Sequence, residues 1–191
     1  MGSVRQIRRG EMYKVPTLPL TGLVDIVLKS GTPKATAAKV VKEQVTTPYD
    51  PATDFYKGIR EAIIEAHQLG LGKRHITNTA ASAHANRISS YTALATNYNG
   101  WWGRKTLTWA TPPRGTWSPP ASVFEVAVNP ELGLDINGDK HAIKLYFKAE
   151  SLSKNRIDII THLMHAALSP ISAISKCTGL ALLELRRSLG L

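Results

Sequence analysis

The stretch ELGLDINGDKHAIKLYFK, residues 131–148, carries the clearest fold signal in the chain. At its centre, Asn137-Gly138 suits a two-residue hairpin turn, because both central positions of that turn need a positive φ. Side chains alternate across a strand, so every second residue of the second arm is expected to face a core. These inward residues are Ile143, Leu145 and Phe147. The stretch therefore predicts an antiparallel hairpin at the heart of a small sheet.

The same alternation predicts that Lys144, Tyr146 and Lys148 share the outer face of this hairpin. Two cations about 13 Å apart along a strand would bracket an aromatic ring and could follow a phosphate backbone. The alternative is a sheet edge protected by lysine, which discourages edge-to-edge aggregation.

Working outward from the hairpin, further strands are expected at residues 105–110 and 122–129. Helical spacing predicts helices before the sheet and an amphipathic helix capped by Ser151 or Ser153 after it. The expected N-terminal helices are 21–28, 34–45, 54–68 and 73–98. The apolar segment 170–191 is expected to form one more helix.

We therefore predict an α+β fold with N-terminal helices, a small antiparallel sheet of three or four strands, and two C-terminal helices. The predicted organisation is a flexible basic N-terminal arm over 1–19 and a single domain over 20–191. Within that domain, helices occupy 20–100, the sheet 105–148 and the closing helices 151–191.

Composition favours a globular protein with a polyanionic partner. The chain has 191 residues, a formal net charge of +10 and a sequence pI of about 9.9. A charge excess of this size favours association with polyanions but does not specify a fold. The single cysteine, Cys177, excludes an intramolecular disulfide, and no apolar run suits export or a membrane span. These features predict a cytoplasmic protein with no membrane partner.

Residues 66–124 contain no Asp or Glu, although they carry six Lys or Arg residues and six Trp or Tyr residues. Cations neutralise phosphates, flat rings stack on bases, and amides read base edges. Adjacent Trp101 and Trp102 lie between glycines, so at least one indole is expected to be partly exposed. Together with the hairpin face, this window gives the candidate nucleic-acid-binding residues Lys73, Arg74, Arg87, Trp101, Trp102, Arg104, Lys105, Arg114, Lys144, Tyr146 and Lys148.

The leading hypothesis is non-catalytic binding of DNA or RNA, with no catalytic residue, cofactor or metal assigned. Segments 21–28 and 34–45 outline a helix-turn-helix, in which Lys34, Lys39 and Lys42 would lie against DNA or form a solvated face.

Two other classes of function remain open. One is a structural or assembly protein that forms a homo-oligomer through its apolar C-terminal helix. The other is a metal-dependent phosphodiesterase, for which Glu125, Glu131, Asp135 and Asp139 could supply acids. The hairpin offers Ala142 or Tyr146 where such a nuclease strand needs a carboxylate, which weighs against this hypothesis. Asp158, His162 and His165 share a helix face, but their spacing is loose for a metal site.

Overall fold

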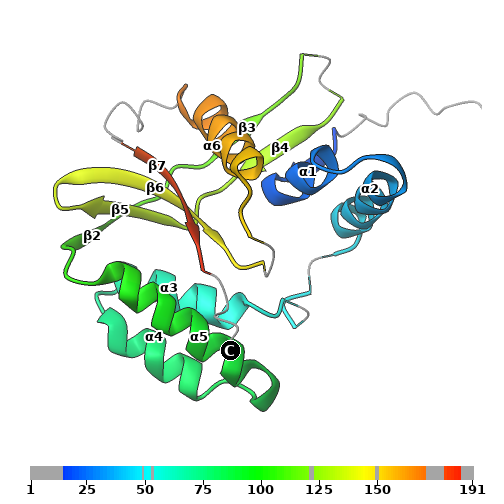
Figure 1. Ribbon diagram of the computed structural model, residues 1–191. Coiled ribbons are helices and arrows are strands. Elements are labelled where there is room, and N and C mark those ends of the chain that lie inside the picture. Colours follow the sequence, from blue (N-terminus) through cyan, green and yellow to red (C-terminus); the bar gives the residue numbers. More distant parts are fainter. Residues whose placement is uncertain are drawn as a thin grey trace, which may run out of the picture.

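The computed structural model describes residues 15–48, 50–52, 54–120, 123–148, 151–170 and 179–185. Helices and strands alternate in blocks along this part of the chain (Figure 1). In chain order they are β1 (Thr17–Pro19), α1 (Leu20–Val27), α2 (Gly31–Thr46), α3 (Lys57–Gln68), α4 (Gly72–Ala81), α5 (Ala85–Trp102), β2 (Leu107–Ala110), β3 (Gly115–Trp117), β4 (Glu125–Val128), β5 (Leu132–Ile136), β6 (Asp139–Tyr146), α6 (Lys154–Leu168) and β7 (Gly179–Glu184).

The larger sheet has four strands in the order β2-β5-β6-β7. Strands β2, β5 and β6 pair antiparallel, whereas β7 lies parallel to β6. The β5–β6 turn places Asn137 at φ 54° and Gly138 at φ 102°, the positive values that a tight hairpin turn requires. The predicted hairpin is therefore confirmed, and it forms the centre of the sheet.

Helices cover both faces of this sheet (Figure 1). Helices α3, α4 and α5 pack on one face through a core that includes Ile143 and Leu145 of β6. Helix α6 covers the other face and contacts β7. Strand β7 alternates between the two cores, since Ala181 packs with the first and Leu182 with the second. Strand β6 is thus enclosed on both faces.

A second, three-stranded sheet has the order β1-β4-β3 and is also mixed. Strand β1 is parallel to β4, and β3 is antiparallel to it. Val126 and Val128 of β4 are fully buried with α1 and α6. Gly115 lets β3 approach α6 closely, because a Cβ there would lie 2.4 Å from the Ala167 carbonyl oxygen. This contact joins the small sheet to the helix that covers the large one.

Helix α2 lies at the edge of the molecule and buries only Ala37 and Val41. Its main contact is with α1. Gly22 of α1 makes this contact close, since a Cβ there would lie 3.1 Å from a methyl group of Val41. The helix pair predicted at residues 21–45 is confirmed, and most of the α2 surface is open to solvent.

The predicted arrangement of a single antiparallel sheet and two C-terminal helices is wrong. The structure has two mixed sheets, and in its described part only α6 follows the sheet strands as a helix. Residues 179–184 form the parallel strand β7 where a helix was expected, because a short apolar run fits a buried strand as well as a buried helix. The rest of the expected helix, residues 171–178 and 186–191, lies outside the described residues.

Two further expectations are corrected locally. The predicted helix 73–98 is divided into α4 and α5 by a break at residues 82–84, and α5 continues through Trp102. Gly103, with φ 52°, ends α5 one residue after the tryptophan pair. Ser153 caps α6 as predicted, its side chain accepting a hydrogen bond from the backbone N–H of Arg156. None of the helices in the described part has the length and apolar character of a membrane span.

Candidate nucleic-acid interface

Four of the predicted binding residues meet where α4 begins and α5 ends, namely Lys73, Trp101, Trp102 and Lys105, and the exposed Arg74 and Arg104 are their neighbours in the chain. We call this surface the basic platform, and it consists of Lys73, Arg74, Trp101, Trp102, Arg104 and Lys105. In Figure 1 the end of α5 lies at the left, next to the start of β2. The platform forms because α4 and α5 are antiparallel neighbours, which sets the first turn of α4 beside the last turn of α5.

The end of α5 holds both lysines of the platform. The last carbonyls of a helix lack intrahelical donors and attract cations. Lys73 Nζ donates to the Gly103 carbonyl oxygen at 2.6 Å, and Lys105 Nζ donates to that of Trp101. Each ammonium also lies over an indole, 5.5 Å from the Trp102 centroid for Lys73 and 5.1 Å from the Trp101 centroid for Lys105.

Both tryptophans are half-buried, as the sequence led us to expect for at least one. Their inner edges join an aromatic cluster with His67 and Tyr98. The ring centroids of Trp102 and His67 are 4.2 Å apart, with 31° between the ring planes. The ring centroids of Trp101 and Tyr98 are 5.4 Å apart. The cluster anchors the indoles on the core and leaves part of each ring at the surface.

The histidine in this cluster adds no charge to the platform at neutral pH. His67 Nε2 and the Tyr98 hydroxyl are 2.6 Å apart and buried. Burial lowers the pKa of His67 from 6.5 to about 4 and raises that of Tyr98 above its ordinary value. Both rings are therefore neutral at pH 7, and the positive charge of the platform comes from its lysines and arginines.

The platform cations are free of carboxylates in the described part of the chain. Arg74 and Arg104 are exposed, and neither they nor Lys73 and Lys105 form an ion pair with a described residue. The acid that precedes the platform in the sequence, Glu65, bonds to His75 at 2.9 Å. The basic platform therefore presents four cations that phosphates could reach.

Arg87 lies apart from the platform, at the first turn of α5. Fourteen residues separate it from Trp101, or about 21 Å along a helix. Its guanidinium donates to the Ala52 carbonyl oxygen at 3.4 Å and lies 5.4 Å from the Phe55 ring. These contacts tie α5 to the segment before α3, so Arg87 serves packing and is not brought to the same surface.

The three residues predicted for the outer face of β6 do not form one exposed surface. Tyr146 is 1% exposed and lies under the Arg156 guanidinium, 5.9 Å from it. Lys144 Nζ binds Glu131 Oε1 at 2.5 Å and the Asn129 carbonyl oxygen at 3.1 Å. Sequence reasoning treated β6 as half-exposed because it missed β7, whose pairing brings α6 over this face.

Lys148 pairs with Asp25 of α1, which also binds Arg156. It lies at the edge of a groove between α1 and α2, far along the chain from the platform residues. The three residues predicted for the β6 face therefore do not act together. Two are lysines held by carboxylates, and the third is a core tyrosine.

Arg114 lines a cavity of about 570 Å³ between α3, β2 and the β4–β5 connection. Trp109, Gln68 and Asn129 line it as well, and Glu131 closes one side. The Glu131 carboxylate is already bonded through both oxygens, to Lys144 and to the Leu145 N–H. Trp109 and Gln68 both lie in the acid-free window, but no local signal marks Gln68 or Asn129 as cavity residues, because they reach the cavity from separate elements.

The last turn of α3 connects this cavity with the platform. His67 packs under Trp102, and its neighbour Gln68 lines the cavity. Strand β2 makes the second connection, because Trp109 follows Lys105 by four residues. Helix α3 and strand β2 therefore each contribute residues near the platform and residues that line the cavity.

The acids considered for a metal centre have structural roles or lie apart. Asp135 Oδ1 accepts a hydrogen bond from Gly138 N–H in the hairpin turn, and Glu131 is engaged as described. Asp158, His162 and His165 are all exposed on α6. Within the described ranges, no group of three His, Cys, Asp or Glu side chains could hold a metal ion.

Comparison of the chain with known protein families, curated proteins and solved structures finds no match.

Proposed function

We propose that the protein binds single-stranded nucleic acid through the basic platform and catalyses no reaction on it. The observation that carries this proposal is the combination of two half-exposed indoles with four cations that pair with no carboxylate among the described residues. Cations and aromatic rings together are what single-strand binders use for phosphates and bases.

Phosphate contacts would begin at Arg74 and Arg104, whose side chains are already exposed. Arginine suits this role because its planar guanidinium can bind two phosphate oxygens at once. Lys73 and Lys105 would add further contacts from positions beside the rings. The neutral state of His67 keeps this charge constant across the physiological pH range.

Base stacking on Trp101 or Trp102 requires the ammonium over each ring to move aside. An exposed cation–π contact is worth about 0.5–1 kcal/mol, whereas stacking a base on an aromatic side chain is worth about 1–3 kcal/mol. Stacking is thus worth more than the cation–π contact, and an ammonium that moves off its ring can exchange its hydrogen bond to the helix-end carbonyl oxygen for one to the phosphate. Stacking needs unpaired bases, which favours a single strand over a duplex.

The Arg114 cavity would hold a base beyond the platform. Trp109 offers a ring, and the amides of Gln68 and Asn129 offer donors and acceptors suited to base edges. Arg60, which also lines this cavity, is bonded to Asp54 at 2.6 Å and contributes little free charge. Arg114 is the exposed cation at this site and would contact the adjoining phosphate.

The proposal is tested by fluorescence anisotropy with short labelled DNA and RNA strands over a range of salt concentrations. We expect single strands to bind more tightly than duplexes and binding to weaken steeply with salt. The double variant Arg104→Glu/Lys105→Glu should weaken binding more than tenfold and lower the logarithmic salt slope by about 1.4, since each phosphate contact contributes about 0.7.

The matched control is Lys34→Glu/Lys42→Glu, which changes the net charge equally at exposed positions of α2. It should leave affinity within about twofold at physiological salt, where charges far from the binding site are screened. Equal weakening by both double variants would mean that net charge, and not the platform, drives binding. Absent or salt-insensitive binding of the unmodified protein to every strand would refute the proposal.

The assembly alternative relied on an apolar C-terminal helix as the subunit contact, and part of that segment forms a strand. Residues 179–184, expected to lie in an apolar helix, pair with β6 inside the larger sheet. No other described feature favours the assembly hypothesis over nucleic-acid binding, so it is not developed as a second function.

A further inference from the structure

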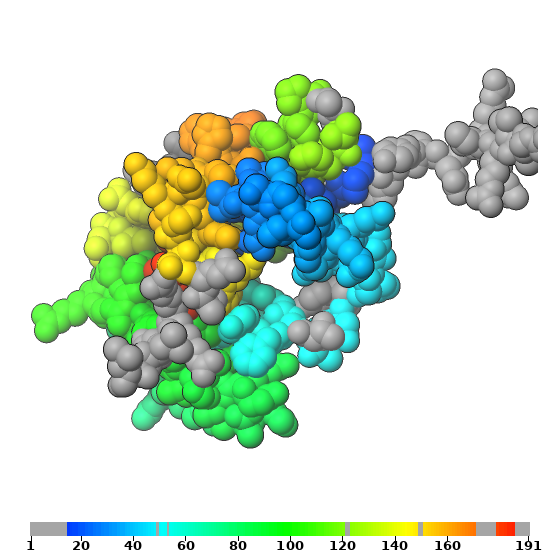
Figure 2. All heavy atoms as spheres, turned by 45° about the vertical axis from the view of Figure 1, so that its right-hand side comes forward, coloured from blue at the N-terminus to red at the C-terminus, as the bar shows by residue number. Residues whose placement is uncertain are grey.

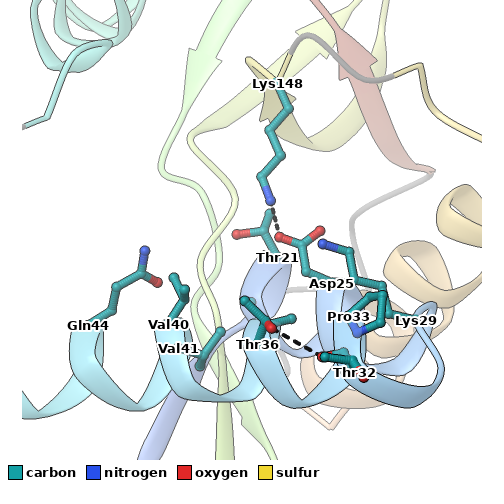
Figure 3. Close-up of a pocket in the computed structure, with 12 residues that line it drawn as sticks. Thr21, Asp25, Lys29, Thr32, Pro33, Thr36, Val40, Val41, Gln44 and Lys148 are labelled. Atoms are coloured by element: carbon teal, nitrogen blue, oxygen red, sulfur yellow. Dashed lines mark hydrogen bonds and ion pairs between the residues drawn. The ribbon is translucent and has the colours of Figure 1, made fainter.

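A groove of about 630 Å³ lies between α1, α2 and the end of β6. Figure 2 shows the surface hollowed beneath the helices drawn in blue, and Figure 3 shows the side chains that line the hollow. Its volume falls within the range of about 300–1,000 Å³ that is usual for small-ligand sites. The groove is separate from the basic platform, which shares no lining residue with it.

Cations dominate one end of the groove. Asp25 binds Lys148 through Oδ2 and the buried Arg156 through Oδ1, at 2.6 Å for the arginine. Lys29 extends over the same end of the groove in Figure 3 and forms no ion pair with any described residue. The single carboxylate of Asp25 thus faces three cations, so this end of the groove keeps a net positive charge.

The Lys148 ammonium keeps donors for a ligand. An ammonium has three N–H groups, and the contact with Asp25 uses one direction. The Lys148 side chain is 40% exposed, so its remaining donors open toward the groove and solvent. Lys29 and Lys148 therefore offer two ammonium groups at the same end of the groove.

Hydroxyl groups accompany these cations. Thr21 of α1 and Thr32 at the start of α2 line the groove, and the Thr21 side chain lies beside Asp25 and Lys148 in Figure 3. Thr36 is committed elsewhere, because its hydroxyl donates to the Thr32 carbonyl oxygen at 3.1 Å. The Thr21 and Thr32 hydroxyls make no side-chain hydrogen bond within the described residues, which leaves both able to donate to an anion.

The opposite wall of the groove is mostly apolar. It is built by the exposed side of α2, where Val40 is 46% exposed and Val41 and Pro33 lie nearby. Gln44 closes this end with a carboxamide. The groove therefore combines a cationic, hydroxyl-lined end with an apolar wall, which matches a ligand that has an anionic head and an apolar or aromatic body.

We propose that this groove binds a small organic phosphate, with the phosphate held by Lys29, Lys148 and the Thr21 hydroxyl and the body lying on Val40. Two ammonium groups match the charge of a phosphomonoester, about −1.5 to −2 at pH 7, better than that of a carboxylate or of a phosphodiester within a nucleic-acid strand. This activity is independent of nucleic-acid binding at the platform.

Phenyl phosphate is the probe, with benzyl alcohol as its uncharged counterpart. Isothermal titration and amide chemical shifts should show saturable binding of phenyl phosphate, with shifts concentrated at Lys29 and Thr32, and no binding of benzyl alcohol. Lys29→Gln should weaken phenyl phosphate binding about tenfold or more, because it removes a charge-assisted hydrogen bond. Lys29 is exposed and makes no ion pair with a described residue, so this variant should fold normally.

Lys34→Gln is the matched control, since it removes the same charge from a position of α2 that does not line the groove. It should leave phenyl phosphate affinity unchanged, as should Arg104→Glu on the platform. Equal weakening by Lys29→Gln and Lys34→Gln, or the absence of saturable binding, would overturn the proposal. So would a Lys29→Gln variant that loses affinity for oligonucleotides but not for phenyl phosphate, because the groove would then belong to the nucleic-acid path.

Discussion

The lysines of the basic platform and the lysines of β6 and its end had the same predicted role but have opposite environments. Lys73 and Lys105 rest on indole rings and helix carbonyls. Lys144 and Lys148 bind the carboxylates of Glu131 and Asp25. The sequence alone thus does not tell which lysine near an aromatic residue keeps all its donors, because a distant acid can fold onto it.

Sequence distance explains this difference. The platform forms from residues 66–124, which contain no acid, and the acid before them is bonded to His75. Asp25 instead reaches Lys148 across 123 residues and Arg156 across 131. The paired lysines stabilise the fold, whereas the platform lysines have no carboxylate partner among the described residues and are the ones proposed to contact nucleic acid. The predictions below separate these two roles.

The largest expected effect belongs to Asp25. The variant Asp25→Asn removes the carboxylate that Lys148 and the buried Arg156 share, and breaking such a partly buried network should lower the free energy of unfolding by about 3–5 kcal/mol. Urea unfolding at pH 7 measures the change. Oligonucleotide affinity should stay within about twofold, because the platform lies elsewhere. A clear loss of affinity in the folded variant would contradict the division of roles.

The pH dependence of this effect follows from the pKa of Asp25. Burial alone would raise that pKa, but hydrogen bonds and charges from Lys148 and Arg156 outweigh it and hold the pKa below the ordinary value of 3.8. The carboxylate therefore stabilises the fold above pH 3.8, and this contribution is lost as the pH falls through the folded-state pKa. The stability gap between the unmodified protein and Asp25→Asn should narrow only below pH 3.8.

The second-largest effect on stability concerns His67, whose ring packs against Trp102 of the platform. Its pKa is about 4 in the folded protein and 6.5 in the unfolded chain, so lowering the pH through this range protonates the unfolded state first. The free energy of unfolding should fall by about 3 kcal/mol between pH 6.5 and pH 4, at 1.36 kcal/mol per unit. His67→Gln should remove this dependence in urea unfolding at several pH values.

Exposed His162 provides the control for that experiment. His162→Gln should leave the pH profile of stability unchanged, since this side chain is exposed on α6. A His67→Gln variant that keeps the full loss of stability between pH 6.5 and pH 4 would show that another group causes it.

Features set by neighbouring residues were predicted from the sequence. The Asn137-Gly138 turn needs two positive φ values, which few dipeptides accept, and the Ser153 cap needs only the N–H groups of the following turn. Trp101, Trp102 and Lys105 were singled out together because they are close in the sequence, but the helix was expected to end before them, whereas α5 continues through Trp102.

Features that depend on distant pairing were missed. Strand β7 was expected as a helix, since the run from Gly179 to Glu184 becomes a strand only by pairing with β6, whose residue Tyr146 pairs with Glu184. That pairing also explains why Tyr146 is buried. Gln68 and Asn129 meet at the Arg114 cavity from separate elements, and no local pattern signals such a meeting.

A pair of matched substitutions tests the comparison directly. Lys144→Gln leaves Glu131, 14% exposed at its side chain, without its ammonium partner and should lower stability by about 1–3 kcal/mol without changing oligonucleotide affinity. Lys105→Gln should change stability by less than about 1 kcal/mol but lower the salt slope of binding by about 0.7. Urea unfolding and anisotropy on both variants measure the two quantities. If Lys144→Gln weakened binding as much as Lys105→Gln, the pairing with Glu131 would not remove Lys144 from the interface.

The smallest effect is expected where an ion pair is easiest to see in the sequence. Lys39 and Glu43 lie one turn apart on α2 at 4.0 Å, with side chains 79% and 64% exposed. Water screens such a pair, so Glu43→Gln should change the free energy of unfolding by less than about 0.5 kcal/mol. Both variants, Glu43→Gln and Asp25→Asn, are measured in the same urea series. If they lost a comparable free energy of unfolding, exposure to solvent would not set the strength of these ion pairs. A much smaller loss would mean that the ion pairs this fold depends on are those that only its long-range contacts create.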